Sequence, residues 1–169
     1  EGGHVAFSPM TETEIAVLRW LKDRYEHVSV ERLVSGQGLQ NIYRALCADA
    51  GNAPRALSPA TISEAALANR DAQCVRALEM FCAVLGTAAA NLVLTLGARA
   101  GCYIGGGIVP KLGAYFAGSA FRARFEAAGR FSQYVAQVPT YVILAQTPAL
   151  RGLATLLQSP EPRHESGHE

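Results

Sequence analysis

Three side chains near the start of the sequence have the chemistry to bind a ligand with several hydroxyl groups. Glu1 and His4 belong to the opening stretch EGGH, and Glu31 follows in the stretch VSVERL. Carboxylates and an imidazole can form hydrogen bonds with sugar hydroxyls, and hydrogen bonds to charged groups are the stronger kind. Taken alone, these residues favour a plainer interpretation. In it Glu1 is a solvated end, His4 a strand residue and Glu31 a charge that favours a helix start.

A glycine run, Gly105-Gly106-Gly107, lies between a short apolar stretch and Pro110. Glycines let a ligand approach the backbone closely, and a following helix start offers unpaired N–H groups to an anion such as a phosphate. For an isolated triplet, a tight strand-to-helix turn is the favoured interpretation. Neither this run nor Gly36-Gln37-Gly38 is followed by Lys-Ser or Lys-Thr, so neither matches a P-loop. The second run also lacks the third glycine of a dinucleotide-binding loop.

The cysteines and the other histidines show no metal-binding pattern. The four cysteines are widely spaced, and three of them lie in apolar stretches: Cys47, Cys74, Cys82 and Cys102. Such cysteines are typical of buried residues in a reducing compartment, and without a C-x-x-C pair no zinc site is expected. His27, His164 and His168 have no partner at ligand spacing. We therefore expect these three to be surface histidines, and we predict no metal-ligating residue.

Composition predicts one soluble globular domain. A chain of 169 residues can bury a sizeable core, and its 50% hydrophobic and 17% charged content is unlike that of a disordered chain. A formal net charge of +1 gives no electrostatic case for binding nucleic acid or an anionic membrane. The longest apolar stretch, residues 80–96, is interrupted by Gly86, Thr87 and Asn91 and is short for a membrane span. We expect a cytoplasmic protein without membrane contact.

The elements that would position these residues follow from periodicity and capping signals. Thr11 and Glu14 have capping-box spacing, as do Thr61 and Glu64, and each pair precedes helical periodicity. Asp71 is expected to cap the longest helix. Helices are predicted over residues 12–26, 39–46, 61–69, 72–96, 121–126 and 148–157, with a single turn at 31–34. A further short helix is expected to start at Pro110, and short strands are predicted at residues 4–7, 102–104 and 141–144.

The order of these elements indicates an α/β fold that is helix-rich and has only a few short strands. The helix over residues 72–96 is apolar nearly all round, which is typical of a central, buried helix. Residues 51–60 contain two prolines and a glycine and are expected to form a connecting loop. Residues 159–169 are polar and non-periodic, so we predict a folded segment over 1–158 followed by a polar tail or linker.

Five blocks of the sequence, read together, carry a family resemblance. They are EGGHVAFSP, VSVERLVSGQGLQNIYRAL, RALEMFCAVLGTAAANLVLTLGARAGCYIGGGIVPKL, FRARFEAAGRFSQYVAQVPTYVI and TPALRGLATLL. In order and spacing they resemble the C-terminal half of bacterial ATP-dependent glucokinases, from Glu1 to about Leu157. The related repressor and kinase family follows its Glu-Gly-x-His stretch with a zinc-binding cysteine cluster. Here the first cysteine is Cys47, so the family without a zinc motif is the better match.

The resemblance implies a partial large domain of the two-domain hexokinase/actin-like (ribonuclease H-like) fold, with the last helix returning to the N-terminal domain. It implies that Glu1, His4 and Glu31 hold glucose hydroxyls between the two domains. It also implies that Gly105 to Gly107 border ATP, with Mg²⁺ as the accompanying ion. The expected partners are glucose, ATP, the N-terminal domain of the same protein and a second copy, since family members are commonly dimers.

Two departures from the family pattern bear on function. The family's Ser-Gly-Pro-Gly loop appears as Ser35-Gly36-Gln37-Gly38, and loss of the fixed φ of proline is expected to loosen it. The family's general-base Asp and Gly-rich phosphate loop belong to the half upstream of the resemblance, so no catalytic residue is assigned in this sequence. We expect the intact parent to transfer the γ-phosphoryl group of ATP to the 6-hydroxyl of glucose in glycolysis. The chain alone is expected to be inactive.

A second interpretation belongs to a different class of protein. Kinase-like sugar domains also occur joined to DNA-binding domains, so the chain is alternatively a sugar-sensing module of a transcriptional regulator. The polar tail after Leu157 suits a linker to such a partner, yet the sequence contains no helix-turn-helix pattern or basic patch. Nucleic acid is therefore expected as a partner only if a DNA-binding domain is fused to the chain.

Overall fold

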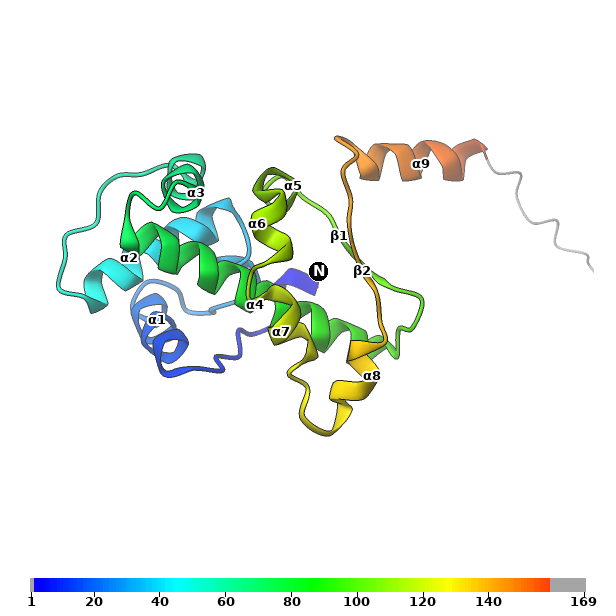
Figure 1. Cartoon of the computed structure of the whole chain (residues 1–169), viewed down its shortest axis with the longest axis horizontal. Helices are drawn as coiled ribbons and strands as arrows, with labels where there is room; N and C mark the ends of the chain where they lie inside the picture. The colour runs from blue at the N-terminus through cyan, green and yellow to red at the C-terminus, as the bar shows by residue number, and fades with distance from the viewer. Residues whose placement is uncertain (1, 159–169) are drawn as a thin grey trace, which may run out of the picture.

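The structure is a computed structural model, and it describes residues 2–158. Glu1 and the predicted tail at 159–169 lie outside the described residues. Figure 1 shows helices packed around one long central helix, with a small sheet to one side. The α-helices are α1 (Glu12–Lys22), α2 (Gly36–Asp49), α3 (Pro59–Leu67), α4 (Ala72–Leu96), α5 (Val109–Leu112), α6 (Ala114–Ala117), α7 (Phe121–Glu126), α8 (Ser132–Ala136) and α9 (Pro148–Gln158). The other elements are the 3₁₀ turns η1 (Gly2–His4), η2 (Val30–Arg32) and η3 (Gly129–Phe131) and the strands β1 (Cys102–Ile104) and β2 (Thr140–Val142).

The central helix α4 begins and ends where its capping residues indicate. One carboxylate oxygen of Asp71 accepts hydrogen bonds from the N–H groups of Gln73 and Cys74, both at 2.9 Å. Gly97 follows the last turn with a φ of +61°, a left-handed conformation that glycine adopts without strain. Helices α2, α3 and α7 pack against α4. The prediction of a long buried helix over 72–96 is confirmed, although Leu92 on its apolar stripe is 52% exposed.

Helix α4 is also long and apolar enough, by length and composition, to cross a membrane. It is the one such helix among residues 2–158. In its most apolar 18-residue window, 61% is buried inside the protein. Because three other helices pack against it, α4 is the core helix of this fold.

The sheet consists of β1 and β2, which pair in parallel with Tyr103 opposite Tyr141. Their rings stack with centroids 5.1 Å apart, and both side chains are exposed. The strands predicted at 102–104 and near 141–144 are confirmed, the second beginning one residue earlier and ending at Val142. Parallel sheets are normally covered on both faces, so this small, partly exposed sheet is an incomplete version of the usual arrangement.

Three sequence predictions differ from the structure. The strand predicted at 4–7 is wrong, because the segment forms η1 and then a single antiparallel bridge between Ala6 and Ser29. The segment that contains Ser29 continues directly into η2, so too few extended residues remain to pair as strands. Helix α1 ends at Lys22 rather than 26, because the chain turns there to bring buried Val28 against the core. Helix α3 is capped by Ser58 rather than Thr61, since Ser followed by Pro is the stronger helix start.

The last helix, α9, lies apart from the other helices (Figure 1). It confirms the helix predicted at 148–157. Its leucines are exposed: Leu150, Leu153, Leu156 and Leu157. Within the described part of the chain, α9 therefore presents an apolar face that this protein does not cover.

Candidate functional site

The structure brings two of the predicted sugar-binding side chains together. His4 Nε2 lies 3.5 Å from Glu31 Oε2, and the two side chains are 61% and 57% exposed. A polar contact this exposed contributes little to folding stability, even when the histidine is protonated. The arrangement therefore leaves both groups accessible to a ligand. Glu1 lies outside the described residues, so its membership of the group stays a prediction.

Backbone hydrogen bonds between two short segments produce this proximity. The N–H of Phe7 donates to the carbonyl of Val28, and the N–H of Val30 donates to the carbonyl of Val5, both at 2.9 Å. We call these two segments, residues 4–7 and 27–31, the clasp. The clasp sets η1 beside η2 and so places His4 next to Glu31.

The start of α2 holds the turn that carries Glu31. Ser35 Oγ donates to the main-chain carbonyl of Glu31 at 2.8 Å, and it also accepts the N–H of Gly38 at 2.9 Å as the N-cap of α2. The side chain of Asn41 is buried, and its Nδ2 donates to the carbonyl of Arg32 at 3.0 Å. Sequence reasoning missed both roles of Ser35, although a Ser directly before helical periodicity is an N-cap signal.

Close packing against the backbone of Leu33 requires glycine at position 38. A Cβ at this position would lie 2.3 Å from the carbonyl carbon of Leu33, so no other residue fits without a shift. Gln37 lies in the first turn of α2, where its Nε2 donates to Asn41 Oδ1 at 3.3 Å. The segment predicted as a Gly-x-Gly loop is therefore the cap and first turn of a helix. The hydrogen bond to Asn41 connects Gln37 to the next helical turn.

The glycine run at 105–107 forms a turn between β1 and α5, as the sequence predicts. Gly106 has a φ of +117°, which favours glycine, and no atom lies within 4 Å of a Cβ built at Gly106 or Gly107. The open space supports close approach of a ligand to this backbone. The predicted helix-dipole contribution is not supported, because α5 contains four residues and a macrodipole needs a longer row of aligned peptides.

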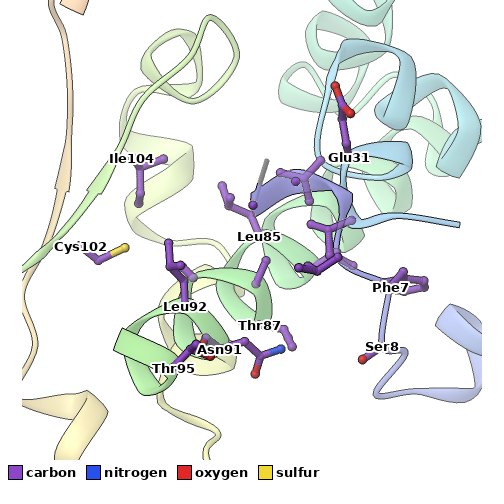
Figure 2. Close-up of a pocket in the computed structure, with 18 of the residues that line it drawn as sticks. Phe7, Ser8, Glu31, Leu85, Thr87, Asn91, Leu92, Thr95, Cys102 and Ile104 are labelled. Carbon is purple, nitrogen blue, oxygen red and sulfur yellow. The ribbon is translucent and has the colours of Figure 1, made fainter. Parts of the chain in front are cut away.

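A cavity of about 650 Å³ is lined both by Glu31 of the predicted sugar-binding residues and by Gly105 of the glycine run. Figure 2 shows Ile104 and Cys102 of β1 facing the α4 leucines across it, with Glu31 on the far side. Gly105 lines the β1 end. Most of the described lining is apolar, so Glu31 supplies a carboxylate at the edge of a largely apolar surface. His4 is not among the described lining residues and lies beside Glu31 in the clasp.

The second charged residue of the lining, Arg124, is already neutralised. Its guanidinium donates to both carboxylate oxygens of Glu14, at 2.7 and 3.2 Å, and to Thr87 Oγ1 at 2.9 Å. Glu14 is 2% exposed and also accepts the N–H of Met10 at 2.6 Å. The capping box predicted for Thr11 and Glu14 is formed in part: Thr11 Oγ1 accepts the N–H of Glu14 at 3.2 Å, while the Glu14 carboxylate reaches back to Met10 and not to Thr11. The structure shows a buried, bidentate ion pair that joins α1 to α7.

Three of the four cysteines are unsuited to nucleophilic chemistry. Burial raises the pKa of Cys74 and of Cys82 to about 11, and it also raises the pKa of Cys102 at the cavity. Thiols with raised pKa values stay protonated at neutral pH, and the thiolate is the reactive form. Within residues 2–158, no group of three or more His, Cys, Asp or Glu side chains is arranged to hold a metal ion.

His27, which the sequence predicts to be an incidental surface histidine, has a specific partner. The side chain is exposed, but its Nε2 lies 2.9 Å from the main-chain carbonyl oxygen of His4. No sequence signal marks this contact, because it depends on the pairing of the two clasp segments. His164 and His168 lie outside the described residues.

Comparison with known proteins gives a consistent family. Residues 1–160 match the family model described as Glucokinase. A glucokinase of Chromobacterium violaceum is 54% identical over 157 residues, which cover 93% of this chain and 45% of that protein. A glucokinase of Ralstonia nicotianae is 52% identical over 166 residues, which cover 93% of this chain and 48% of that protein. The chain thus spans about half the length of the curated relatives it matches, and the matched half is their C-terminal part.

Solved structures agree with this result. The crystal structure of a glucokinase from an Antarctic psychrotroph has a TM-score of 0.85 at 36% identity, covering 94% of this chain and 50% of that one. A glucokinase from Balamuthia mandrillaris, solved in complex with glucose, has a TM-score of 0.69 at 22% identity, which shows a shared fold. It covers 86% of this chain and 43% of that chain. The predicted fold class, a partial α/β hexokinase-like domain, is confirmed.

Proposed function

The chain belongs to the glucokinase family, and on that premise we propose that it is half of a kinase that phosphorylates glucose. The whole enzyme transfers the γ-phosphoryl group of ATP to the 6-hydroxyl of glucose. One observation carries the proposal. Glu31, with His4 3.5 Å away, lines one end of a cavity whose other end is lined by Gly105 of the glycine turn. Polar side chains suited to a sugar and an open backbone turn thus lie along the same cavity.

Glu31 and His4 hold the sugar in this proposal, with Glu1 as the third member of the group. The Glu31 carboxylate accepts hydrogen bonds from sugar hydroxyls, and the His4 imidazole accepts or donates according to its tautomer. A hydrogen bond to a charged group contributes about 1.5–3 kcal/mol once water is excluded. Water exclusion requires a cover over these exposed side chains, which the rest of the enzyme would supply.

The glycine turn at 105–107 borders the nucleotide in this proposal, because its open backbone allows ATP to approach closely. Mg²⁺ normally binds through one or two carboxylates together with substrate phosphates and water. Glu31 is the one carboxylate among the described lining residues, and it is assigned to the sugar. The residues present therefore do not fit a Mg²⁺ site by themselves, and we assign the ion to the phosphates of ATP.

The remaining parts of the proposal concern the whole enzyme. The general base and the first phosphate loop belong to the other half, so the chain alone cannot position the transferred group. We also propose a cytoplasmic enzyme that assembles as a homodimer. The relatives and structures reported above are all named as glucokinases, and nothing in them favours the transcriptional-regulator alternative.

A coupled spectrophotometric assay with ATP, Mg²⁺ and glucose tests this proposal. The full-length polypeptide should phosphorylate glucose at a rate typical of enzymes, roughly 1–10³ s⁻¹. The 169-residue chain should read at background. Turnover by the chain alone would show that the catalytic residues lie within it. A full-length protein that is folded but inactive toward glucose would refute the proposed substrate.

A further inference from the structure

We propose that His27 is a positioning residue for the sugar site, acting through His4 without touching the sugar. His27 Nε2 lies 2.9 Å from the main-chain carbonyl oxygen of His4. Because a carbonyl oxygen can only accept, the ring nitrogen must carry the proton and donate. This hydrogen bond fixes the peptide plane that follows the Cα of His4, and so holds the imidazole beside Glu31. The inference rests on the proposed function, in which His4 and Glu31 bind glucose.

The local backbone explains why His4 needs such a hold. Gly2 and Gly3 precede it, and glycine has the widest conformational freedom of any residue. No atom lies within 4 Å of a Cβ built at Gly2, and a Cβ at Gly3 would make one ordinary contact, 3.5 Å from the Glu31 Cβ, so packing restrains this end of η1 only at Gly3. The hydrogen bond from the Val30 N–H restrains the carbonyl of Val5, one peptide plane further along. Without His27, the restrained part of the clasp begins one residue after the residue that must be placed.

A role in folding stability does not account for His27. Its side chain is exposed and its hydrogen bond is exposed. The loop that carries it is already fixed by Val28 and Ser29, which are 8% and 2% exposed. The Phe7 N–H also donates to the carbonyl of Val28. Removing the imidazole therefore frees the carbonyl of His4 and leaves the rest of the clasp in place.

The first part of the test uses the full-length enzyme without sugar. Long-range ¹H–¹⁵N correlation NMR at neutral pH should show that Nε2 of His27 carries a proton. In His27→Ala the ring signals of His4 should shift and broaden. The neighbouring substitution Glu26→Gln, exposed on the same loop, should leave them unchanged. A His27 ring protonated only at Nδ1 would overturn the proposal. So would His4 ring signals that neither shift nor broaden in His27→Ala.

The second part measures kinetics in the full-length enzyme. His27→Ala should raise KM for glucose about three- to tenfold, as expected for loss of one ordering hydrogen bond. KM for ATP and the melting temperature should stay at their wild-type values. His27→Gln should restore most of the glucose affinity, because its amide N–H can reach a carbonyl in the same direction.

The outcomes separate this inference from the proposed function. If the wild-type enzyme does not respond to glucose, the proposed function fails and takes the sugar part of this inference with it. If the wild type responds and His27→Ala has an unchanged KM for glucose, the glucose site stands and the positioning role is wrong. A His27→Ala enzyme with a lowered melting temperature and an equal rise in both KM values would make His27 a stability residue, which also overturns the proposal.

Discussion

Glu31 and Arg124 are the charged residues among the described lining of the cavity, and their surroundings give them different roles. Glu31 is 57% exposed, and its carboxylate lies 3.5 Å from the His4 ring. Arg124 is largely buried, and its charge is matched by both oxygens of Glu14. An accessible, weakly paired carboxylate suits ligand binding. A buried bidentate pair suits the joining of two helices.

Substitution of Arg124 should therefore destabilise the fold strongly. Arg124→Met leaves the Glu14 carboxylate buried without its cation, a change that costs about 3–5 kcal/mol. The control is Glu126→Gln, which removes a more exposed ion pair with Arg122 and should cost less than about 1 kcal/mol. Urea denaturation at pH 7 gives both free energies of unfolding. Similar small losses in the two variants would contradict the structural role assigned to Arg124.

The buried thiols predict a loss of stability in alkali. An unfolded cysteine loses its proton near about pH 8.5, whereas burial raises the pKa of Cys82 to about 11. Between these values the unfolded chain binds fewer protons than the folded one, so the free energy of unfolding falls as pH rises. In Cys82→Ala, that fall between pH 9 and pH 11 should be smaller by about 1–2 kcal/mol. Urea denaturation across this range checks it, and identical pH slopes would refute it.

At the scale of elements, the site depends on two sets of hydrogen bonds that hold short segments together. The clasp pairs residues 4–7 with 27–31, and the first turn of α2 holds η2 through Ser35 and Asn41. Neither segment is long enough to be stable alone, since isolated single turns do not form in water. The position of Glu31 is therefore a property of the packed α2 start.

Gly38 and Gly36 form a matched pair that tests this dependence. Gly38→Ala places a Cβ 2.3 Å from the carbonyl carbon of Leu33, so overpacking should cost about 1–3 kcal/mol and displace η2. Gly36→Ala meets Pro59 at 3.5 Å, an ordinary contact, and should be neutral or stabilising by up to about 1 kcal/mol. Thermal unfolding compares the two variants. A tolerated Gly38→Ala would show that α2 does not press against this turn.

The sequence predicts elements that carry local signals and misses contacts made at a distance. Asp71 and Gly97 are capping signals, so the bounds of α4 could be read from the residues. The Glu14–Arg124 pair joins residues 110 positions apart, and no local pattern indicates it. The strand predicted at residues 4–7 is absent from the structure. An alternating sequence pattern does not show how many residues of a neighbouring segment are extended and free to pair with it. His4 and Glu31 were named through family resemblance, since their types and spacing alone favoured a plainer interpretation.

At the scale of the whole molecule, several features fit one half of a larger enzyme. The chain spans about half the length of its curated relatives. Its parallel sheet has two strands among the described residues, and α9 exposes a row of leucines apart from the core (Figure 1). The cavity beside Glu31 is open and mostly apolar (Figure 2). In the proposed enzyme, the other half covers these surfaces and encloses the sugar.

The most direct test of the account is the kinetics of Glu31→Gln in the full-length enzyme, with Glu26→Gln as control. Loss of a charged hydrogen bond to a buried sugar hydroxyl corresponds to about 1.5–3 kcal/mol, or roughly ten- to hundredfold in affinity. Glu31→Gln should therefore raise KM for glucose, or lower kcat/KM for glucose, by at least about tenfold. KM for ATP and the melting temperature should barely move. Unchanged glucose kinetics together with a lowered melting temperature would make Glu31 a structural charge and contradict the proposed sugar site.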